Sequence, residues 1–336
     1  MSIDKSELQD AARKAFATDV RCADTAQVLN QIVGLGWLGI CVPEDLGGLG
    51  LGREAQAVIH FELGRILGPG SLAAHLAIID ALVAAERTDL LETALAGEFM
   101  TASMRLETGT VTAGTISGRF HAVPDADRAQ AILVAASDRI ILLPLSLPDI
   151  AIAESRMWDQ TRRFFEVTLH RVPVNAGATL ASGKAASRMW DALNSTLLRA
   201  IAADSLGGAD ATLQMTLGYL GVRRQFDRLL AMFQALKHRC ADMKTALASA
   251  EALLWADAGQ YDVGLGCDVT GVGAMKGHAT RVYHQVVEEA VQLHGGIGLT
   301  EEHDCHRFLK RALLNGVLGG RADIWEEALG RRMLAA

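Results

Sequence analysis

The sequence predicts an α+β protein that is mainly α, with an N-terminal helical domain, a small middle β domain and a C-terminal four-helix bundle. Half of the 336 residues are apolar but only 5% are aromatic, so Ala and Leu, which are strong helix formers, supply most of the core. Four of the six prolines lie between Pro124 and Pro173, and none follows Pro173. Because proline breaks helix interiors, the long proline-free C-terminal part is predicted to be helical.

We place the N-terminal helical domain at residues 1–99, the β domain at 100–183 and the bundle at 184–336. The first part shows helical periodicity, which the loop VPEDLGGLGLG at residues 42–52 interrupts. Thr, Ser, Gly and Val become more frequent in the middle part. These shifts in composition set the proposed boundaries.

Strand signals identify the middle domain. Apolar runs at Ala131–Ala136 and Ile140–Leu143 are bounded by turn-forming residues. Phe165, Val167 and Leu169 alternate with polar residues, which is the pattern of a half-buried strand. Short strands between turns therefore predict a small sheet.

In the C-terminal part, apolar residues recur in steps of three and four, which places them on one face of each helix. These residues are Leu193, Leu197 and Ile201 in one segment, Leu236, Cys240, Met243, Leu247, Ala250 and Leu254 in the second, and Val282, Val286, Ala290 and Leu293 in the third. Gly264, Gly266, Gly271 and Gly273 are expected to form a connection between two helices. A shorter helix is expected to begin near Asp304. Successive apolar faces predict an antiparallel bundle.

The charge excludes several classes of partner. Lys and Arg number 32 and Asp and Glu number 39, which gives a net charge of −7. An acidic chain without a basic stripe binds poorly to nucleic acid or to an anionic membrane surface. No charge-free apolar run reaches the roughly 18 residues of a membrane-spanning helix, and the charged N-terminus lacks a secretory signal. We expect a cytoplasmic protein that binds neither nucleic acid nor membrane.

Cysteine and histidine usage argues against disulfides and metals. The cysteines are Cys22, Cys41, Cys240, Cys267 and Cys305. Their odd number and the lack of a CxxC pair fit a reducing compartment. His294, His303, Cys305 and His306 flank a glycine-rich bend instead of sharing a helix face, so we predict no metal site.

Two glycine-rich segments resemble nucleotide-binding loops but are not interpreted as such. Gly34, Gly36 and Gly39 form a GxGxxG pattern, but a helical segment precedes it where a dinucleotide-binding loop needs a strand. We interpret it as a helix end and a turn. The segment 177–185, GATLASGKA, has the wrong glycine spacing for a phosphate-binding loop.

Two other segments have ligand-binding character. Arg223, Arg224 and Arg228 lie within six residues between two predicted helices, and guanidinium groups bind phosphate oxygens in pairs of hydrogen bonds. The alternative is a solvated basic turn. Residues 292–301 combine Gln292 with glycines that let a ligand approach the backbone. The alternative there is a plain helix C-terminus followed by a turn.

Three segments together resemble the flavin-dependent acyl-CoA dehydrogenase family. They are GWLGICVPEDLGGLGLG at 36–52, VRRQFDRLLAMFQALKHRCADM at 222–243 and AVQLHGGIGLTEEH at 290–303. Their order matches the family's helical domain, β domain and four-helix bundle. The resemblance implies that FAD is the cofactor and that it is bound across a subunit interface.

The resemblance also implies which residues contact FAD. Arg223, Gln225, Phe226 and Gln234 would contact its adenine and pyrophosphate half, and Gln292, Gly295 and Gly296 would line the same half from the other side. Asp227 departs from the family, which usually has glycine there. It places a carboxylate near a phosphate unless it turns outward to Arg228.

The family removes hydrogen from the α- and β-carbons of an acyl-CoA, and a glutamate acts as the base that takes the α-proton. In this sequence Gly319 occupies the usual base position and Leu197 occupies the second position known in the family. No catalytic residue is therefore assigned. The middle domain also lacks the family's T-E-P…G-S-D and W-I-T-N segments, which hold the flavin ring and cover the substrate.

These losses together resemble the short, base-lacking subunit of bacterial α2β2 acyl-CoA dehydrogenases of steroid side-chain catabolism. The resemblance implies a base-bearing sister subunit, an acyl-CoA substrate such as a steroid side-chain CoA ester, and an electron acceptor such as an electron-transfer flavoprotein. We further expect Gly316, Gly319 and Gly320 to widen the substrate cavity for a bulky acyl group.

Two alternatives remain open. The first is a self-sufficient homotetramer that uses another acid as the base, with Asp204, Glu288 and Glu301 as candidates. The second is a scaffold that binds no flavin and has no catalytic role. The arginine, glutamine and glycine residues of the two FAD segments argue against the second alternative.

Overall fold

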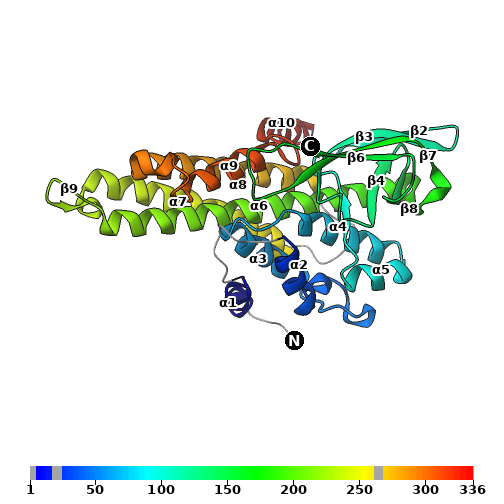
Figure 1. The fold of residues 1–336 in the computed structure, drawn as a ribbon, viewed down its shortest axis with the longest axis horizontal. Coiled ribbons are helices and arrows are strands. Elements are labelled where there is room, and N and C mark those ends of the chain that lie inside the picture. The colour runs from blue at the N-terminus through cyan, green and yellow to red at the C-terminus, as the bar shows by residue number, and fades with distance from the viewer. Residues whose placement is uncertain (1–4, 17–24, 261–267, 336) are drawn as a thin grey trace.

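The computed structural model describes residues 5–16, 25–260 and 268–335. Figure 1 shows an elongated molecule in which the long helix α6 (Gly183–Val222) runs from the sheet at one end toward the small β9 hairpin at the other. Helices α1 to α5 lie below α6 in this view, and α9 and α10 lie above it. The predicted fold class, mainly helical with a middle sheet, is confirmed.

The N-terminal helices are α1 (Lys5–Ala15), α2 (Thr25–Gly34), α3 (Gly52–Arg65), α4 (Ser71–Ala84) and α5 (Thr88–Leu95). Of these helices, α3 and α4 pack directly against α6, while α1 packs on α3 and α5 packs on α4. The contact between α3 and α6 depends on glycine, because a Cβ atom at Gly64 would lie 2.0 Å from the backbone oxygen of Asp204 and one at Gly207 would lie 1.8 Å from that of Phe61. The two helix backbones therefore touch directly, and larger residues at these glycines would push them apart.

The GxGxxG segment is a helix end and a turn, as predicted. Gly34 is the last residue of α2, Gly36 has a left-handed φ of 69°, and a 3-10 helix, η2 (Trp37–Gly39), follows. A second 3-10 helix, η3 (Glu44–Leu46), lies in the loop before α3. Trp37 and its neighbours are buried here, so the segment belongs to the core.

The middle part forms one sheet with the strand order β6-β7-β3-β2-β4-β5-β8, and β1 pairs with β4. The strands are β1 (Met100–Ala102), β2 (Thr108–Thr112), β3 (Thr115–Pro124), β4 (Ala131–Ala136), β5 (Arg139–Pro144), β6 (Ile150–Ser155), β7 (Phe164–Pro173) and β8 (Ala178–Ser182). The three strand segments expected from the sequence correspond to β4, β5 and β7, and are confirmed. The short 3-10 helix η4 (Val174–Ala176) connects the last two strands.

The remaining helices form the bundle. They are α6, α7 (Gln234–Gln260), α8 (Val269–His294), α9 (Cys305–Val317) and α10 (Ala322–Ala335). The expected apolar face of α7 is buried at Met243, Leu247, Ala250 and Leu254. Helix α9 begins directly after Asp304, as the sequence predicts.

The expected glycine connection between two helices is partly wrong. Gly271 and Gly273 lie inside α8, and Gly264 and Gly266 fall outside the described residues. A Cβ atom at Gly273 would lie 2.2 Å from the indole ring of Trp325. This glycine therefore permits close packing of α10 on α8, and its role is steric.

The division at residues 99 and 183 stays a prediction. All strands of the large sheet lie between residues 100 and 182. However, one apolar core cluster extends from the N-terminal helices through β1, β4 and β5 to the first half of α6. The three parts therefore share a core at their junction.

The described cysteines are free thiols: Cys41, Cys240 and Cys305. Burial raises the pKa of the Cys41 and Cys305 thiols to about 12, so both stay protonated and unreactive. Cys22 and Cys267 lie outside the described residues. Within the described ranges, every helix is too short or too polar to cross a lipid bilayer.

Candidate functional site

A tight hairpin continues the chain beyond α6. Strands β9 (Arg224–Gln225) and β10 (Arg228–Leu229) pair antiparallel around a two-residue turn. Phe226 and Asp227 form this turn with left-handed φ values of 51° and 61°. Asp tolerates this conformation, but a bulky residue such as Phe is strained in it. The hairpin therefore holds an exposed phenyl ring at its tip at a conformational cost, which is common at functional sites.

Two of the three hairpin arginines have local partners. Arg224 donates a hydrogen bond from Nη2 to the backbone oxygen of Asp227 at 3.1 Å. The guanidinium of Arg228 lies 4.0 Å from the ring centre of Phe233, so Arg228 does not serve as the expected outward partner of Asp227. Within the described parts of the chain, no hydrogen bond or ion pair holds the side chain of Arg223. Its guanidinium is free to bind a ligand.

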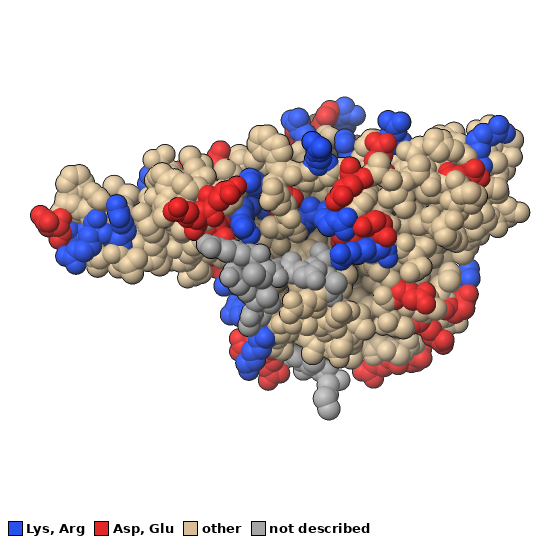
Figure 2. Space-filling view, in the orientation of Figure 1, with Lys and Arg blue, Asp and Glu red and all other residues tan. Residues whose placement is uncertain are grey.

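The hairpin tip is exposed to solvent. Phe226 is 86% exposed and packs edge-on against Phe233, with ring centres 6.3 Å apart. Figure 2 shows basic side chains gathered at this end of the molecule, with acidic ones beside them. The 3-10 helix η5 (Leu230–Met232) leads from the hairpin to Gln234, the exposed first residue of α7.

The second predicted segment follows α8. Gln292 is exposed in the last turn of α8, and Gly295 has a positive φ of 67° at the start of the 3-10 helix η6 (Gly295–Leu299). A Cβ atom at Gly295 or Gly296 would meet nothing within 4 Å. These two glycines therefore leave the backbone open for the approach of a ligand.

Aromatic packing joins the two segments. Tyr219, one turn before Arg223, stacks on His294 with ring centres 4.6 Å apart and donates a hydrogen bond to the backbone oxygen of His294 at 3.4 Å. His303 packs on His294 at 4.4 Å. The structure thus places both predicted segments at the same end of the bundle.

The histidines at this end have a packing role. His294 Nδ1 donates a hydrogen bond to the backbone oxygen of Ala290 at 2.7 Å, and burial lowers the pKa of His294. His306 contacts the backbone oxygen of His303 through Nδ1 at 2.8 Å. Across the described ranges, no group of three or more His, Cys, Asp or Glu residues is positioned to hold a metal ion.

The donor set fits the adenine and pyrophosphate half of FAD. The seven residues predicted to contact it are all exposed: Arg223, Gln225, Phe226, Gln234, Gln292, Gly295 and Gly296. They supply a free guanidinium, side-chain amides, an aromatic face and open backbone, which are the groups that bind phosphate and a purine ring. Because they form a projecting end, a second surface is needed to enclose a ligand held there.

Both predicted base positions lie in apolar surroundings. Gly319 has a positive φ of 66°, and a Cβ atom there would lie 2.7 Å from Cδ2 of Leu198 and 3.3 Å from Cδ1 of Ile201. Leu197, the second position, is 3% exposed in the same core cluster as Ile201. Aliphatic side chains of α6 therefore occupy the space beside Gly319 that a base would need.

The turn that carries Gly319 is anchored on several sides. The backbone N–H of Gly319 donates to the oxygen of Met104 at 2.8 Å, and the indole N–H of Trp325 donates to the oxygen of Gly319 at 2.8 Å. The Lys276 ammonium donates to the oxygen of Gly320 at 2.9 Å, and burial lowers the pKa of Lys276 to about 7. These bonds prevent the turn from moving aside to admit a larger residue.

The expectation that glycines widen a cavity at this turn is wrong for Gly319 and Gly320. A Cβ atom at Gly320 would lie 3.0 Å from Nε1 of Trp325, and the space beside Gly319 is filled as described above. Gly316, in contrast, has no atom within 4 Å of a built Cβ and lies in a cleft of about 600 Å³. The indole ring of Trp325 and the aliphatic side chains of α6 fill the space beside Gly320 and Gly319.

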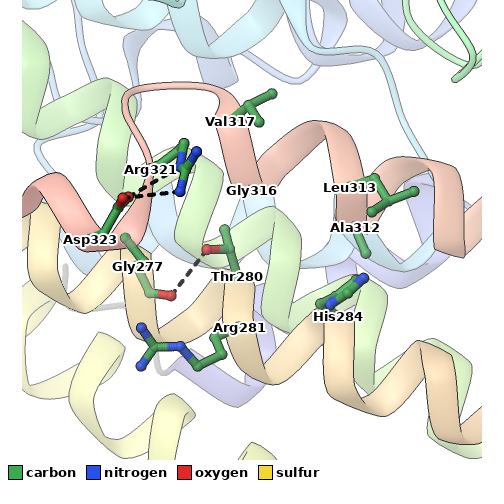
Figure 3. Close-up of a pocket in the computed structure, with 11 residues that line it drawn as sticks. Gly277, Thr280, Arg281, His284, Ala312, Leu313, Gly316, Val317, Arg321 and Asp323 are labelled. Atoms are coloured by element: carbon green, nitrogen blue, oxygen red, sulfur yellow. Dashed lines mark hydrogen bonds and ion pairs between the residues drawn. The ribbon is translucent and has the colours of Figure 1, made fainter.

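The cleft at Gly316 lies between α8, α9 and the start of α10 (Figure 3). Its charged rim residues have partners: Arg321 pairs with Asp323 at 3.0 Å and Arg281 pairs with Glu326 at 2.5 Å. The single acidic residue among those lining the cleft, Asp323, is therefore neutralised by its neighbour.

Asp204, the first alternative base, is enclosed by partners. One carboxylate oxygen accepts hydrogen bonds from Arg162 at 2.7 Å and Arg311 at 3.2 Å, and the other accepts one from Asn315 at 2.6 Å. Asp204 is 4% exposed. A carboxylate enclosed in this way is not accessible to a substrate, so its role is structural.

The same buried network includes Asp159 in the loop between β6 and β7. Arg311 Nε donates to Asp159 at 2.6 Å. Burial is the largest single influence and would raise the pKa of Asp159, but the charge of Arg311 and the hydrogen bonds from Thr161 and Arg311 together lower the pKa. Sequence reasoning missed this network, because Asp159 and Arg162 resemble ordinary turn residues and their partners are distant in the chain.

The other alternative bases lie at the surface. Glu288 is paired with His284 at 3.6 Å across one turn of α8. Glu301 is exposed in the turn after η6. Neither lies at the apolar contact of Gly319 and Leu198.

We expect Gly319→Glu to destabilise the fold without creating activity. The substitution places a non-glycine residue at positive φ, which costs about 1–2 kcal/mol, and forces a carboxylate against Leu198. Thermal unfolding and a dehydrogenase assay of the chain alone would measure both effects. Gly330→Glu, at a glycine of α10 with no atom within 4 Å of a built Cβ, is the matched control. Turnover by the Gly319→Glu chain would contradict this expectation.

Comparisons with known proteins agree with the sequence resemblance. The model of the acyl-CoA dehydrogenase C-terminal domain matches residues 197–334, and that of the acyl-CoA dehydrogenase N-terminal domain matches residues 4–89. The acyl-CoA dehydrogenase IpdE2 of Mycolicibacterium smegmatis is 30% identical over 282 residues, which cover 83% of this chain and 78% of that protein.

A longer relative and a solved structure extend the comparison. The acyl-CoA dehydrogenase FadE34 of Mycobacterium tuberculosis is 29% identical over 309 residues, which cover 86% of this chain but only 40% of FadE34. A solved variant of the Tcur3481-Tcur3483 steroid ACAD superposes with a TM-score of 0.86 at 26% identity, and the match covers 98% of each chain.

Proposed function

Because the chain belongs to the acyl-CoA dehydrogenase family, we propose that it is a subunit of a flavin-dependent enzyme that introduces an α,β double bond into an acyl-CoA thioester. FAD is the cofactor. This chain contributes contacts to the adenine and pyrophosphate half of FAD, and a sister subunit contributes the base and encloses the flavin ring.

One contrast within the structure carries this proposal. At one end of the bundle, the free guanidinium of Arg223 and the open backbone of Gly295 and Gly296 are presented outward. At the base position, Leu198 lies 2.7 Å from where a side chain at Gly319 would begin. This contrast supports a chain that binds the nucleotide half of FAD and relies on another subunit for the base.

The residues of this chain bind and orient the nucleotide half of FAD. Arg223 would offset part of the pyrophosphate charge, and the amides of Gln225, Gln234 and Gln292 would fix the direction of the nucleotide. When bound, FAD accepts the hydride that leaves the β-carbon of the substrate. The sister subunit's carboxylate would remove the α-proton, and the hairpin would help to hold the nucleotide half of the cofactor in place.

The name of the Tcur3481-Tcur3483 steroid ACAD supports a steroid side-chain CoA ester as the substrate. The α2β2 arrangement accounts for the base position, which this chain cannot supply. An electron-transfer flavoprotein is the proposed electron acceptor, and the cytoplasm is the proposed location.

A homotetramer with an atypical base is less well supported. Asp204 is enclosed by Arg162, Arg311 and Asn315. Glu288 and Glu301 are surface residues away from the turn at Gly319. A flavin-free scaffold would not require an exposed arginine on a strained hairpin.

Co-production with a base-bearing homologue encoded beside this chain tests the proposal. The chain alone should be purified with little flavin, and the complex should contain one FAD for each pair of chains and oxidise a steroid side-chain CoA ester. FMN should bind the complex much more weakly than FAD, because FMN lacks the half that this chain contacts. Active yellow protein from the chain alone would support the homotetramer, and a complex without flavin would support the scaffold.

A further inference from the structure

The hairpin contains one charged group that the proposed function does not use. Asp227 is exposed at the second position of the turn, between Phe226 and Arg228. Among the described residues, neither a hydrogen bond nor an ion pair engages its carboxylate, because Arg224 bonds to its backbone oxygen and Arg228 lies over the ring of Phe233. The carboxylate therefore points into solvent beside the groups proposed to bind FAD.

The turn does not require a carboxylate. Asp227 has a φ of 61°, a conformation that glycine and asparagine adopt at least as readily. The Arg224 side chain bonds to the backbone oxygen, which any residue at position 227 would provide. The conformation of the hairpin thus explains why the residue is small or polar, but leaves its charge unexplained.

The charge of Asp227 matters because the proposed ligand, FAD, carries negatively charged phosphates. A carboxylate about 4 Å from a phosphate repels it by roughly 1 kcal/mol even in water, and by more where solvent is excluded. Asp227 would therefore weaken the binding of FAD unless it forms hydrogen bonds of its own. The adenosine half of FAD offers two kinds of donor, the ribose hydroxyls and the adenine amino group. Two neighbouring hydroxyls match the two oxygens of one carboxylate, which is how an acidic residue holds a ribose in dinucleotide-binding folds.

We propose that Asp227 accepts hydrogen bonds from the ribose hydroxyls of the FAD adenosine and so positions the adenine against Phe226. This inference rests on the proposed function and deepens it. In this arrangement Arg223 binds the pyrophosphate, Asp227 binds the adjacent ribose and Phe226 covers the purine.

The test measures the dissociation constant of FAD from the assembled complex for the unchanged chain, Asp227→Gly and Asp227→Asn. Each protein is measured with FAD and with an analogue that contains 2′-deoxyadenosine. We expect Asp227→Gly to weaken FAD binding by about tenfold or more, because a hydrogen bond to a charged acceptor is lost. The analogue should bind the unchanged chain more weakly by a similar factor, and should bind Asp227→Gly almost as well as FAD does. Asp227→Asn keeps one acceptor oxygen and should lose less affinity for FAD than Asp227→Gly does.

Opposite results would overturn the inference. Tighter or unchanged binding of FAD by Asp227→Gly would show that the carboxylate only repels the phosphate or faces away. If the analogue binds more weakly than FAD by the same factor in the unchanged chain and in Asp227→Gly, then Asp227 does not contact the ribose. Asp45→Asn removes an exposed negative charge on η3 and should leave the dissociation constant unchanged.

Arg223→Ala separates this inference from the proposed function. If Arg223→Ala releases FAD and Asp227→Gly does not, only the role of Asp227 is wrong. If neither variant affects FAD, the nucleotide does not bind at the hairpin and the proposed function is wrong as well.

Discussion

Arg223→Ala is expected to release most of the FAD from the assembled complex while the fold stays intact. Arg223 has no side-chain partner within the described residues, so its removal disturbs no internal contact. Loss of a charged hydrogen-bonding pair with the pyrophosphate should weaken FAD binding by about 10- to 100-fold. The ratio of flavin absorbance to protein after gel filtration measures the loss, and circular dichroism checks the fold.

Arg188→Ala provides the matched control for this variant. Arg188 is also exposed on α6, but it lies near the end of that helix that adjoins β8. Its replacement removes the same charge without affecting the hairpin, and flavin content should not change. Full flavin occupancy in Arg223→Ala would show that the nucleotide is bound elsewhere.

Arg311→Leu is expected to cause the largest loss of stability. Arg311 is 0% exposed and donates to Asp159 at 2.6 Å, to Asp204 at 3.2 Å and to the backbone oxygens of Leu67 and Gly68 at 3.0 and 3.1 Å. Without it, the buried carboxylate of Asp159 loses its ion pair, while Asp204 keeps its pair with Arg162. Removing one partner of a buried charge pair costs about 3–5 kcal/mol, which thermal or urea unfolding would detect.

Arg163→Leu tests whether burial is the cause of this effect. Arg163 lies in the same loop as Asp159 and pairs with Asp127 at 2.9 Å and Glu154 at 3.2 Å, and these three side chains are at least one-third exposed, while the buried Asp125 lies farther away, at 4.0 Å. Exposed pairs of this kind contribute about 0–1 kcal/mol. Adding Asp159→Asn to Arg311→Leu should restore part of the lost stability, because it removes one unbalanced charge. Equal losses in Arg163→Leu and Arg311→Leu would contradict this explanation.

The hairpin residues expected to contact FAD come from one short segment, and their role, which the family resemblance implies, stays a prediction. Arg223, Gln225 and Phe226 are consecutive or nearly so, and a short hairpin has few ways to place them. That these hairpin residues lie near Gln292 and Gly295 was predicted only through the family resemblance. The structure brings the two segments together through the stack of Tyr219 on His294, which no spacing in the sequence indicates.

The roles of several glycines and charges could not be predicted. Gly273 resembles a loop residue in the sequence, but it lies in α8, where its lack of a side chain leaves room for Trp325. Asp204 resembles a candidate base, but Arg162 and Arg311 enclose it. In both cases the deciding partner lies more than 40 residues away in the chain, so local patterns carry no information about it.

Periodicity and residue type in the sequence alone determined the order of helical and β regions, the apolar faces of the bundle and the donor groups of the hairpin. These properties depend on interactions between residues a few positions apart, which recur in any protein. Only the tertiary structure decided that aliphatic side chains fill the space beside Gly319 and that Asp204 is part of a buried ion network. Close packing and desolvation produce these results, and both depend on which distant segments the fold brings into contact.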